Sequence, residues 1–143
     1  LRENALVVNA LQRHATVVAQ LSVAEGFGLT LTEAMWKARP VVTTGVGGLA
    51  EQVVPGRHGL VLPGDGGDVA GGAARAFDRL LADPQLARHL GDAARRRVAE
   101  QFLPDRQLRR WGALLTELVA ATAPDLAAPD AVAPDRATPE ARS

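Results

Sequence analysis

Three short apolar runs rich in β-branched residues lie in the first half of the chain. They are TVVAQL at 16–21, PVVTT at 40–44 and GLVL at 59–62. Runs of this length, bounded by glycine, proline or polar residues, are typical of strands that are covered on both faces. The sequence therefore predicts three short buried strands.

Segments with helical spacing separate these runs. A helix is predicted over 3–15, where the apolar residues that recur are Leu6, Val7, Ala10 and Leu11. A second helix is predicted to start at Thr30 and to end at Pro40. Its apolar stripe consists of Leu31, Ala34, Met35 and Ala38. A glycine turn at 45–48 then precedes a short helix over about 49–54.

The second half of the chain is predicted to be helical. One amphipathic helix carries Val69, Ala73, Ala76, Phe77, Leu80 and Leu81 on a single face. Asp83 and Pro84 form an N-cap followed by proline at the first helical position, which starts a helix to about 102. Another helix starts at Pro104, with an apolar stripe of Leu108, Trp111, Leu115 and Leu118.

Strands that alternate with helices predict an α/β fold, with a parallel sheet and helices on both faces. Three strands are fewer than the five or six of a complete doubly wound domain. We therefore expect a partial Rossmann-like sheet, the C-terminal portion of such a domain, with its other strands before Leu1. The predicted domain covers 1–121. Spaced prolines predict a disordered Ala/Pro/Asp-rich tail over 122–143.

Composition excludes several classes of protein. The 143 residues carry 16 basic and 16 acidic side chains, which argues against binding of nucleic acid or an anionic membrane. Cysteine is absent and the three histidines are scattered, so no metal site is predicted. No apolar run is long enough to span a bilayer, and no signal peptide is recognised. We expect a cytoplasmic protein without a cofactor.

The segment 22–42, SVAEGFGLTLTEAMWKARPVV, carries the candidate chemistry. A glycine turn holds Glu25, and the helix that follows holds Glu33, eight positions later. This layout places acceptors for sugar hydroxyls beside the free N–H groups of a helix start. The segment therefore predicts a site for a sugar nucleotide.

The segment EGFGLTLTEAM resembles the C-terminal domain of retaining glycosyltransferases of the GT-B fold, in the family-4 group. A PVV strand, a VGG turn and the pattern G-x-x-G-L-V-L at 56–62 extend the resemblance. Glu25 and Glu33 match the group's E-x7-E motif. The stretches VNALQRHATVVAQLS and AMWKARPVV resemble the trehalose-forming branch, the trehalose glycosyltransferring synthases and trehalose phosphorylases. The similarity covers about 3–119.

The resemblance implies transfer of glucose from a UDP-, ADP- or GDP-glucose donor to a sugar acceptor, with retention at the anomeric carbon. Glu25 would be the catalytic residue and would contact hydroxyls of the donor sugar, while Glu33 would contact the ribose. The implied donor-binding residues are Glu25, Gly26, Phe27, Gly28, Leu29, Thr30 and Glu33. Glycine also allows backbone amides to approach the leaving diphosphate.

Several of these residues have structural alternatives. Thr30 and Glu33 also form a capping-box pattern, with Thr30 as N-cap. Glu33 has a potential helical partner in Lys37. The ring of Phe27 is expected to pack against the protein, and Gly47-Gly48 is expected to be a structural turn before a surface acid, Glu51.

The remaining candidate side chains are assigned no chemistry. His14, His58 and His89 have no partner at useful spacing, and Trp36 and Trp111 are expected to anchor packing. The run 95–97, three arginines on one helix, is interpreted as a solvated face.

Compared with the family pattern, this sequence lacks an acceptor-binding N-terminal domain and the basic pair that would hold the diphosphate. Lys37 lies downstream of the motif and does not match that pair. We therefore expect no catalysis by this chain alone. The alternatives are a non-catalytic nucleotide-sugar-binding module and an inactive truncated product. The nucleobase, the acceptor and the choice between synthase and phosphorylase stay open.

Overall fold

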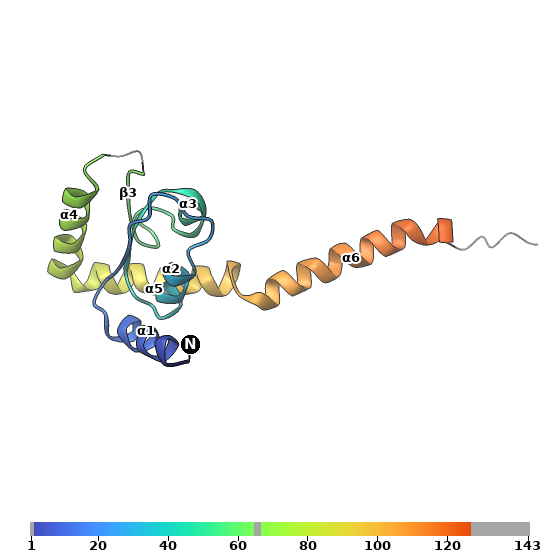
Figure 1. Cartoon of the computed structure of the whole chain (residues 1–143), viewed down its shortest axis with the longest axis horizontal. Helices are drawn as coiled ribbons and strands as arrows, with labels where there is room; N and C mark the ends of the chain where they lie inside the picture. The colour runs from blue at the N-terminus through green and yellow to red at the C-terminus, as the bar shows by residue number, and fades with distance from the viewer. Residues whose placement is uncertain (1, 65–66, 127–143) are drawn as a thin grey trace, which may run out of the picture. The chain divides into compact units, whose positions relative to one another are not determined.

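The computed structural model describes residues 2–64 and 67–126. The chain divides into two compact units, Leu1–Arg106 and Gln107–Ser143, which are described separately. The first unit holds the sheet and most of the helices. The second holds most of a single long helix (Figure 1).

The sheet consists of three parallel strands in the order β1-β2-β3. The strands are β1 (Val18–Gln20), β2 (Val41–Thr44) and β3 (Leu60–Leu62). Val18 pairs with Val41, and Val42 pairs with Leu60. The predicted parallel sheet is confirmed, although β1 is shorter than the run that predicted it.

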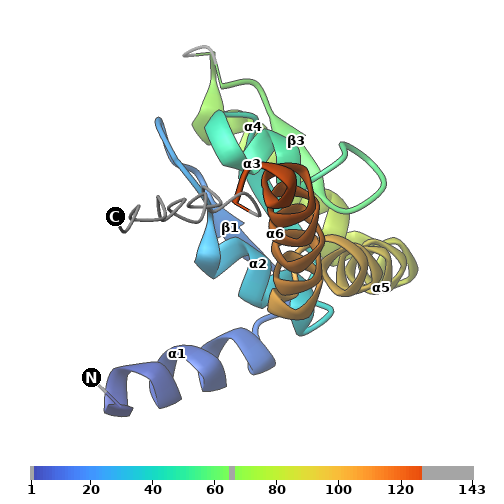
Figure 2. The same ribbon diagram turned by 90° about the vertical axis from the view of Figure 1, so that its right-hand side faces the viewer.

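Helices alternate with these strands as the sequence predicted. Those of the first unit are α1 (Arg2–His14), α2 (Leu29–Trp36), α3 (Gly47–Gln52), α4 (Val69–Ala82) and α5 (Pro84–Gln101). The last helix, α6, runs over Pro104–Leu126. Figure 2 shows α1, β1 and α2, which follow one another along the chain in the first unit.

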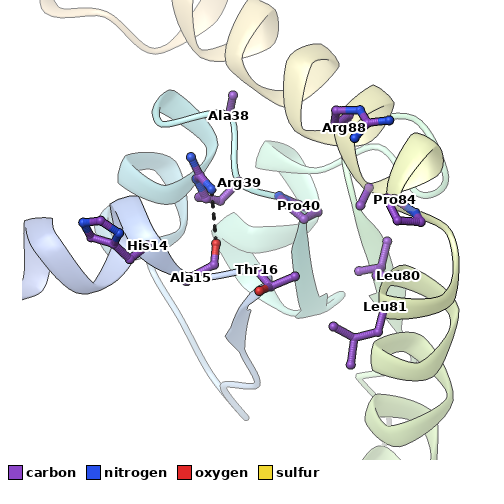
Figure 3. Close-up of a pocket in the computed structure, with 11 residues that line it drawn as sticks. His14, Ala15, Thr16, Ala38, Arg39, Pro40, Leu80, Leu81, Pro84 and Arg88 are labelled. Carbon is purple, nitrogen blue, oxygen red and sulfur yellow. Dashed lines mark hydrogen bonds between the residues drawn. The ribbon is translucent and has the colours of Figure 1, made fainter.

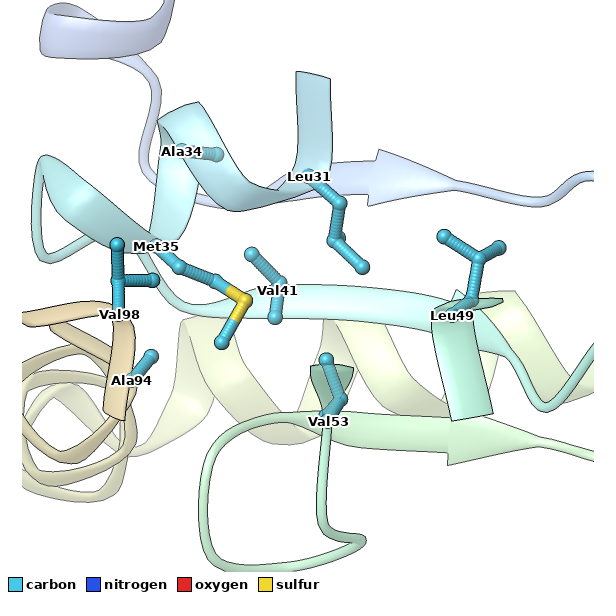
Figure 4. Packing of buried hydrophobic residues seen from close by; sticks show 8 residues of the cluster. All are labelled: Leu31, Ala34, Met35, Val41, Leu49, Val53, Ala94 and Val98. Atoms are coloured by element: carbon cyan, nitrogen blue, oxygen red, sulfur yellow. The ribbon is translucent and has the colours of Figure 1, made fainter. Parts of the chain in front are cut away.

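Two apolar clusters cover the two faces of the sheet. Adjacent residues of a strand point to opposite faces, and β2 accordingly directs Val41 into one cluster and Val42 into the other. Figure 4 shows the Val41 cluster, which consists of Leu31, Ala34, Met35, Val41, Leu49, Val53, Ala94 and Val98. The Val42 cluster consists of Val42, Leu62, Ala73, Ala76, Leu80, Ala87 and Leu90. Helices on both faces make this a doubly wound α/β arrangement.

The ends of α2 differ from the prediction. The helix ends at Trp36, four residues before Pro40, so the proline does not terminate it. The chain reverses because Ala38 adopts the left-handed region, with φ of 56°. The N–H groups of Ala38 and Arg39 then donate to the carbonyls of Met35 and Ala34 at 2.9 and 3.0 Å. These bonds satisfy carbonyls that the helix end leaves free.

The predicted start of α5 is confirmed. Asp83 is the N-cap, and its Oδ1 accepts hydrogen bonds from the N–H groups of Gln85 and Leu86 at 3.0 and 2.9 Å. Pro84 is the first helical residue. By contrast, α3 begins at Gly47, so the predicted glycine turn includes the first residues of that helix.

The second unit corrects the predicted boundary of the tail. α6 continues to Leu126, past the expected domain end at 121, and the hydroxyl of Thr122 donates to the carbonyl of Leu118 at 2.8 Å. The rest of the predicted tail lies outside the described residues. Among the helices described, none is both long and apolar enough to cross a membrane.

Candidate functional site

The loop from 21 to 28 connects the carboxyl end of β1 to α2, and it holds the first candidate acid. Side chains at the end of β2 fix its beginning. The hydroxyl of Thr43 donates to the carbonyl of Gln20 at 2.9 Å, and that of Thr44 donates to the carbonyl of Ser22 at 2.6 Å. Both threonines are buried. The loop therefore starts from a fixed position at the sheet edge where ligands bind in open α/β folds.

Gly47 and Gly48 hold the middle of this loop. The N–H of Gly48 donates to the carbonyl of Glu25 at 3.1 Å. A Cβ on Gly47 would lie 3.1 Å from the carbonyl carbon of Glu25 and closer still to its oxygen. A Cβ on Gly48 would likewise approach the carbonyl of Gly26. The absence of both side chains is what lets α3 approach the loop so closely.

Gly28, at the end of the loop, is buried against a glutamine. In the orientation that satisfies both groups, the amide of Gln52 accepts from the N–H of Gly28 at 3.1 Å and donates to its carbonyl at 3.3 Å. Gln52 is fully buried. The same carbonyl accepts from the hydroxyl of Thr32 at 3.1 Å. The start of α2 is therefore fixed by a partner from α3.

The first turn of α2 carries no side-chain cap. Its N-cap is Gly28, so the prediction of Thr30 as N-cap is wrong. The interaction of Gly28 with Gln52 sets the helix start two residues earlier, and Thr30 lies within the first turn. Uncapped N–H groups at a helix start are donors for an anionic ligand.

Glu25 is half-buried and bonded to a residue that sequence reasoning missed. Its Oε2 accepts from Nε2 of Gln20, the last residue of β1, at 2.9 Å. Oε1 of Gln20 is buried and has no hydrogen-bond partner within the described part of the chain. The sequence signal was a polar side chain ending an otherwise apolar strand. Gln20 orients the carboxylate of Glu25.

Glu33 is exposed on α2 and lines a cavity of about 430 Å³. The cavity lies between α1 and α2, and its lining residues are Asn4, Ala5, Val8, Asn9, Thr30, Glu33 and Lys37. Glu25 does not line it, so the structure does not bring the two acids together in this cavity. Lys37 does not form an ion pair with the carboxylate of Glu33. Its Nζ donates to Oε1 of Gln12 at 2.6 Å and to the backbone carbonyl of Glu33 at 3.5 Å.

The two apolar residues of the motif have different surroundings. The ring of Phe27 packs edge-on against Phe102, with centroids 5.9 Å apart, as expected for a packing residue. Leu29 is 67% exposed at the start of α2. Gly26 has open space around its Cα, so a ligand could approach its backbone without obstruction.

The other candidate side chains take structural positions. His58 is buried, and its Nδ1 accepts from the N–H of Val54 at 3.3 Å. Burial, and then the charges of Arg97 and Arg57, lower the pKa of His58 from 6.5. Arg97 is not simply solvated as predicted, because its guanidinium donates to the backbone carbonyls of Gln52 and Glu51 at 2.7 and 2.6 Å. Over residues 2–64 and 67–126, no three potential metal ligands cluster together.

Comparison with known proteins finds one family over most of this chain. The family described as "Glycosyl transferases group 1" matches residues 4–97. A relative named "Trehalose synthase", from Rubrobacter xylanophilus, is 45% identical over 105 residues, which cover 73% of this chain and 24% of the relative. The chain thus spans about a quarter of the length of the curated relatives it matches.

Solved structures share the architecture. Sucrose-phosphate synthase from Thermosynechococcus elongatus superposes with a TM-score of 0.67 and 39% identity, covering 75% of this chain and 26% of that one. The Anabaena protein HepE, solved in complex with UDP-glucose, superposes with a TM-score of 0.68 over 77% of this chain and 30% of its own. At 23% identity the second likeness shows the fold alone.

Proposed function

This chain belongs to the group 1 glycosyltransferases, with the fold of the C-terminal part of a GT-B enzyme, and we propose that it holds the nucleotide-sugar donor of such an enzyme. The reaction we propose is transfer of glucose to a sugar acceptor with retention at the anomeric carbon. The acceptor would bind outside the region that this chain shares with its relatives, which is about a quarter of their length. We place this reaction in the cytoplasm.

One observation carries this proposal. The loop from Glu25 to Gly28 follows the carboxyl end of β1 and is fixed by buried partners from β2 and α3, and it places the carboxylate of Glu25 beside the start of α2. The first turn of α2 is uncapped beside Gly26, where the backbone is open. Rigid positioning of amides and a carboxylate before the ligand arrives is what donor binding requires.

Each group has a proposed partner on the donor. The carboxylate of Glu25 accepts hydrogen bonds from hydroxyls of the glucosyl group, held in position by Gln20. The carboxylate of Glu33 accepts from the ribose hydroxyls. The N–H of Thr30, in the first turn of α2, faces the diphosphate and stabilises the charge that develops as it leaves. Ionised acceptors make such hydrogen bonds about twice as strong as neutral ones.

The trehalose-forming branch is the proposed specificity. Four relatives named "Trehalose synthase" are 38–45% identical to this chain over their matched regions. A relative named "Alpha-maltose-1-phosphate synthase" matches a shorter stretch of 91 residues, and a mannosyltransferase relative matches 107 residues at a lower identity of 36%. Glucose transfer is the chemistry that we assign, and the structure of HepE with UDP-glucose supports a nucleoside-diphosphate glucose as the donor class.

Calorimetric titration with UDP-, ADP- and GDP-glucose tests this proposal. We expect saturable binding of at least one donor and an affinity about tenfold or more weaker for Glu33→Gln, since the variant keeps the shape but loses the charge. Glu51→Gln, an exposed acid on α3, is the matched control and should leave affinity unchanged. Failure of all three donors to bind, or equal affinities for the two variants, contradicts the proposal.

A binding module without catalysis is the second candidate function. The chain spans about a quarter of its relatives and contains no basic residue matching the family's diphosphate-binding pair. If the chain is catalytically active, adding glucose as acceptor to the chain with a bound donor should release free nucleotide. Binding without any nucleotide release would favour the module.

A further inference from the structure

A second cavity gathers four cationic side chains at the opposite end of the sheet from Glu25. Its volume is about 250 Å³, and its lining residues are Arg13, Trp36, Lys37, Arg39 and Arg95. Arg13 lies in the last turn of α1, before β1, and Arg39 lies just before β2. The cavity is therefore at the amino ends of the strands, whereas Glu25 follows the carboxyl end of β1.

The four charges have no acidic partner among residues 2–64 and 67–126. The ion pair found there joins Arg75 to Asp68, at 3.6 Å, and lies elsewhere. Acceptors of hydrogen bonds from this cluster are neutral, such as Oδ1 of Asn9 for Arg13 and Oε1 of Gln12 for Lys37. A chain with balanced charge thus concentrates uncompensated positive charge in one small cavity.

Neighbouring groups hold these side chains in place. Arg39 donates to the carbonyls of Ala15 and Lys37, both at 3.3 Å. Figure 3 shows the bond from Arg39 to Ala15. The guanidinium of Arg95 lies over the ring of Trp36, 5.4 Å from its centroid. Fixed cations lose little conformational freedom when an anion binds.

Stabilisation of helix ends explains only part of this arrangement. Cations near a helix C-terminus interact favourably with the helix dipole, and this accounts for Arg13 and Lys37. It does not account for Arg95, which lies well inside α5. The interpretation of 95–97 as a solvated face is therefore incomplete, because Arg95 turns toward Trp36 and the other cations.

We propose that this basic cavity binds a phosphate group, as inorganic phosphate or as the phosphate of a small phosphate monoester. Guanidinium groups match the geometry of phosphate oxygens, and several cations are needed to hold a dianion. An adjoining cavity of about 350 Å³ shares Arg39 and is walled in part by Pro40, Leu80 and Pro84 (Figure 3). It offers room for the remainder of a phosphorylated molecule. The site lies away from Glu25, and it shares Lys37 with the cavity that Glu33 lines.

The two tryptophans provide a local test by NMR. The indole N–H signal of Trp36 reports the cavity, that of Trp111 reports α6, and Trp111→Phe assigns them. We expect inorganic phosphate to shift the Trp36 signal saturably, while sodium chloride at matched ionic strength does not. The Trp111 signal should stay in place. Equal shifts with both salts, or a shift that never saturates, would overturn the proposal.

Two arginine variants then separate the site from general charge effects. Arg95→Gln should weaken phosphate binding about tenfold or more. Arg96→Gln removes an exposed neighbour of the same charge that does not line the cavity, and should leave binding unchanged. Equal affinities for the two variants would contradict the assignment. A hexose phosphate that binds more tightly than inorganic phosphate identifies the monoester as the source, and the reverse order identifies the free ion.

Discussion

The close approach of α3 to the acidic loop makes a sharp prediction for Gly48→Ala. The new Cβ would lie 2.9 Å from the carbonyl carbon of Gly26 and 3.2 Å from Cα of Phe27, whereas ordinary contact begins at 3.4 Å. The obstacle is backbone rather than a flexible side chain. The carbonyl oxygen of Gly26 would lie closer still, so the loop or α3 must move by about 1 Å or more to restore normal separations.

The free energy of this displacement can be bounded. Overpacking costs about 1–3 kcal/mol, and the hydrogen bond from Gly48 to the carbonyl of Glu25 contributes about 1 kcal/mol. Alanine gains about 0.5–1 kcal/mol over glycine within a helix. The net destabilisation is about 2 kcal/mol, which corresponds to a fall in Tm of about 8–16 °C for a unit of this size.

Thermal unfolding followed by circular dichroism measures this effect. Gly26→Ala is the matched control, because no atom lies within 4 Å of the position that its new methyl group would take and its φ is not in the left-handed region. Its Tm should stay within about 2 °C of the parent. Helix propensity alone would give Gly48→Ala a higher Tm than the parent. If its Tm is higher, or equals that of Gly26→Ala, the α3–loop contact does not have the effect described.

Four further predictions follow from local geometry. The lowered pKa of His58 keeps its side chain neutral in the folded state, so the free energy of unfolding should fall as the pH drops below 6.5. Denaturation measured over a series of pH values should show a weaker pH dependence for His58→Asn. Asp83→Ala should cost about 1 kcal/mol in urea unfolding, whereas Asp92→Ala on the same helix should change it by less than about 0.5 kcal/mol. Ala38→Gly should raise stability by about 1 kcal/mol, because φ is 56° there; a lower Tm would refute this. Gly112→Ala, with open space around its Cα in α6, should increase helical ellipticity, and unchanged ellipticity would count against a continuous α6.

Local patterns were sufficient where the structure depends on neighbouring residues. The three β-branched runs became the three strands, but the prediction that all three are buried is wrong: only β2 is buried throughout, whereas β1 and β3 are largely half-buried and Ala19 of β1 is exposed. Asp83 became an N-cap because its acceptor reaches N–H groups two and three positions away. The position of the acidic motif at the carboxyl edge followed from its place after β1.

Predictions failed where a distant partner decides the local conformation. Thr30 is not the N-cap of α2, because Gln52, far along the chain, binds Gly28 and makes that residue the N-cap. Pro40 does not end α2, because Ala38 reverses the chain earlier. The role of Gln20 beside Glu25 depends on side-chain packing, which periodicity does not reveal. Arg95 and Trp36 come from different helices, so their contact was also hidden from the sequence.

The central claim is that the segment from Glu25 to Glu33 binds a nucleotide sugar. Two-dimensional NMR of the whole chain during titration with UDP-, ADP- and GDP-glucose tests it most directly. Our account predicts that at least one of these donors shifts the amide signals of Gly26, Gly28 and Thr30 most, and that these shifts diminish in Glu33→Gln. If the largest shifts fall elsewhere with every donor, or if none of the three moves these amides, the claim is contradicted.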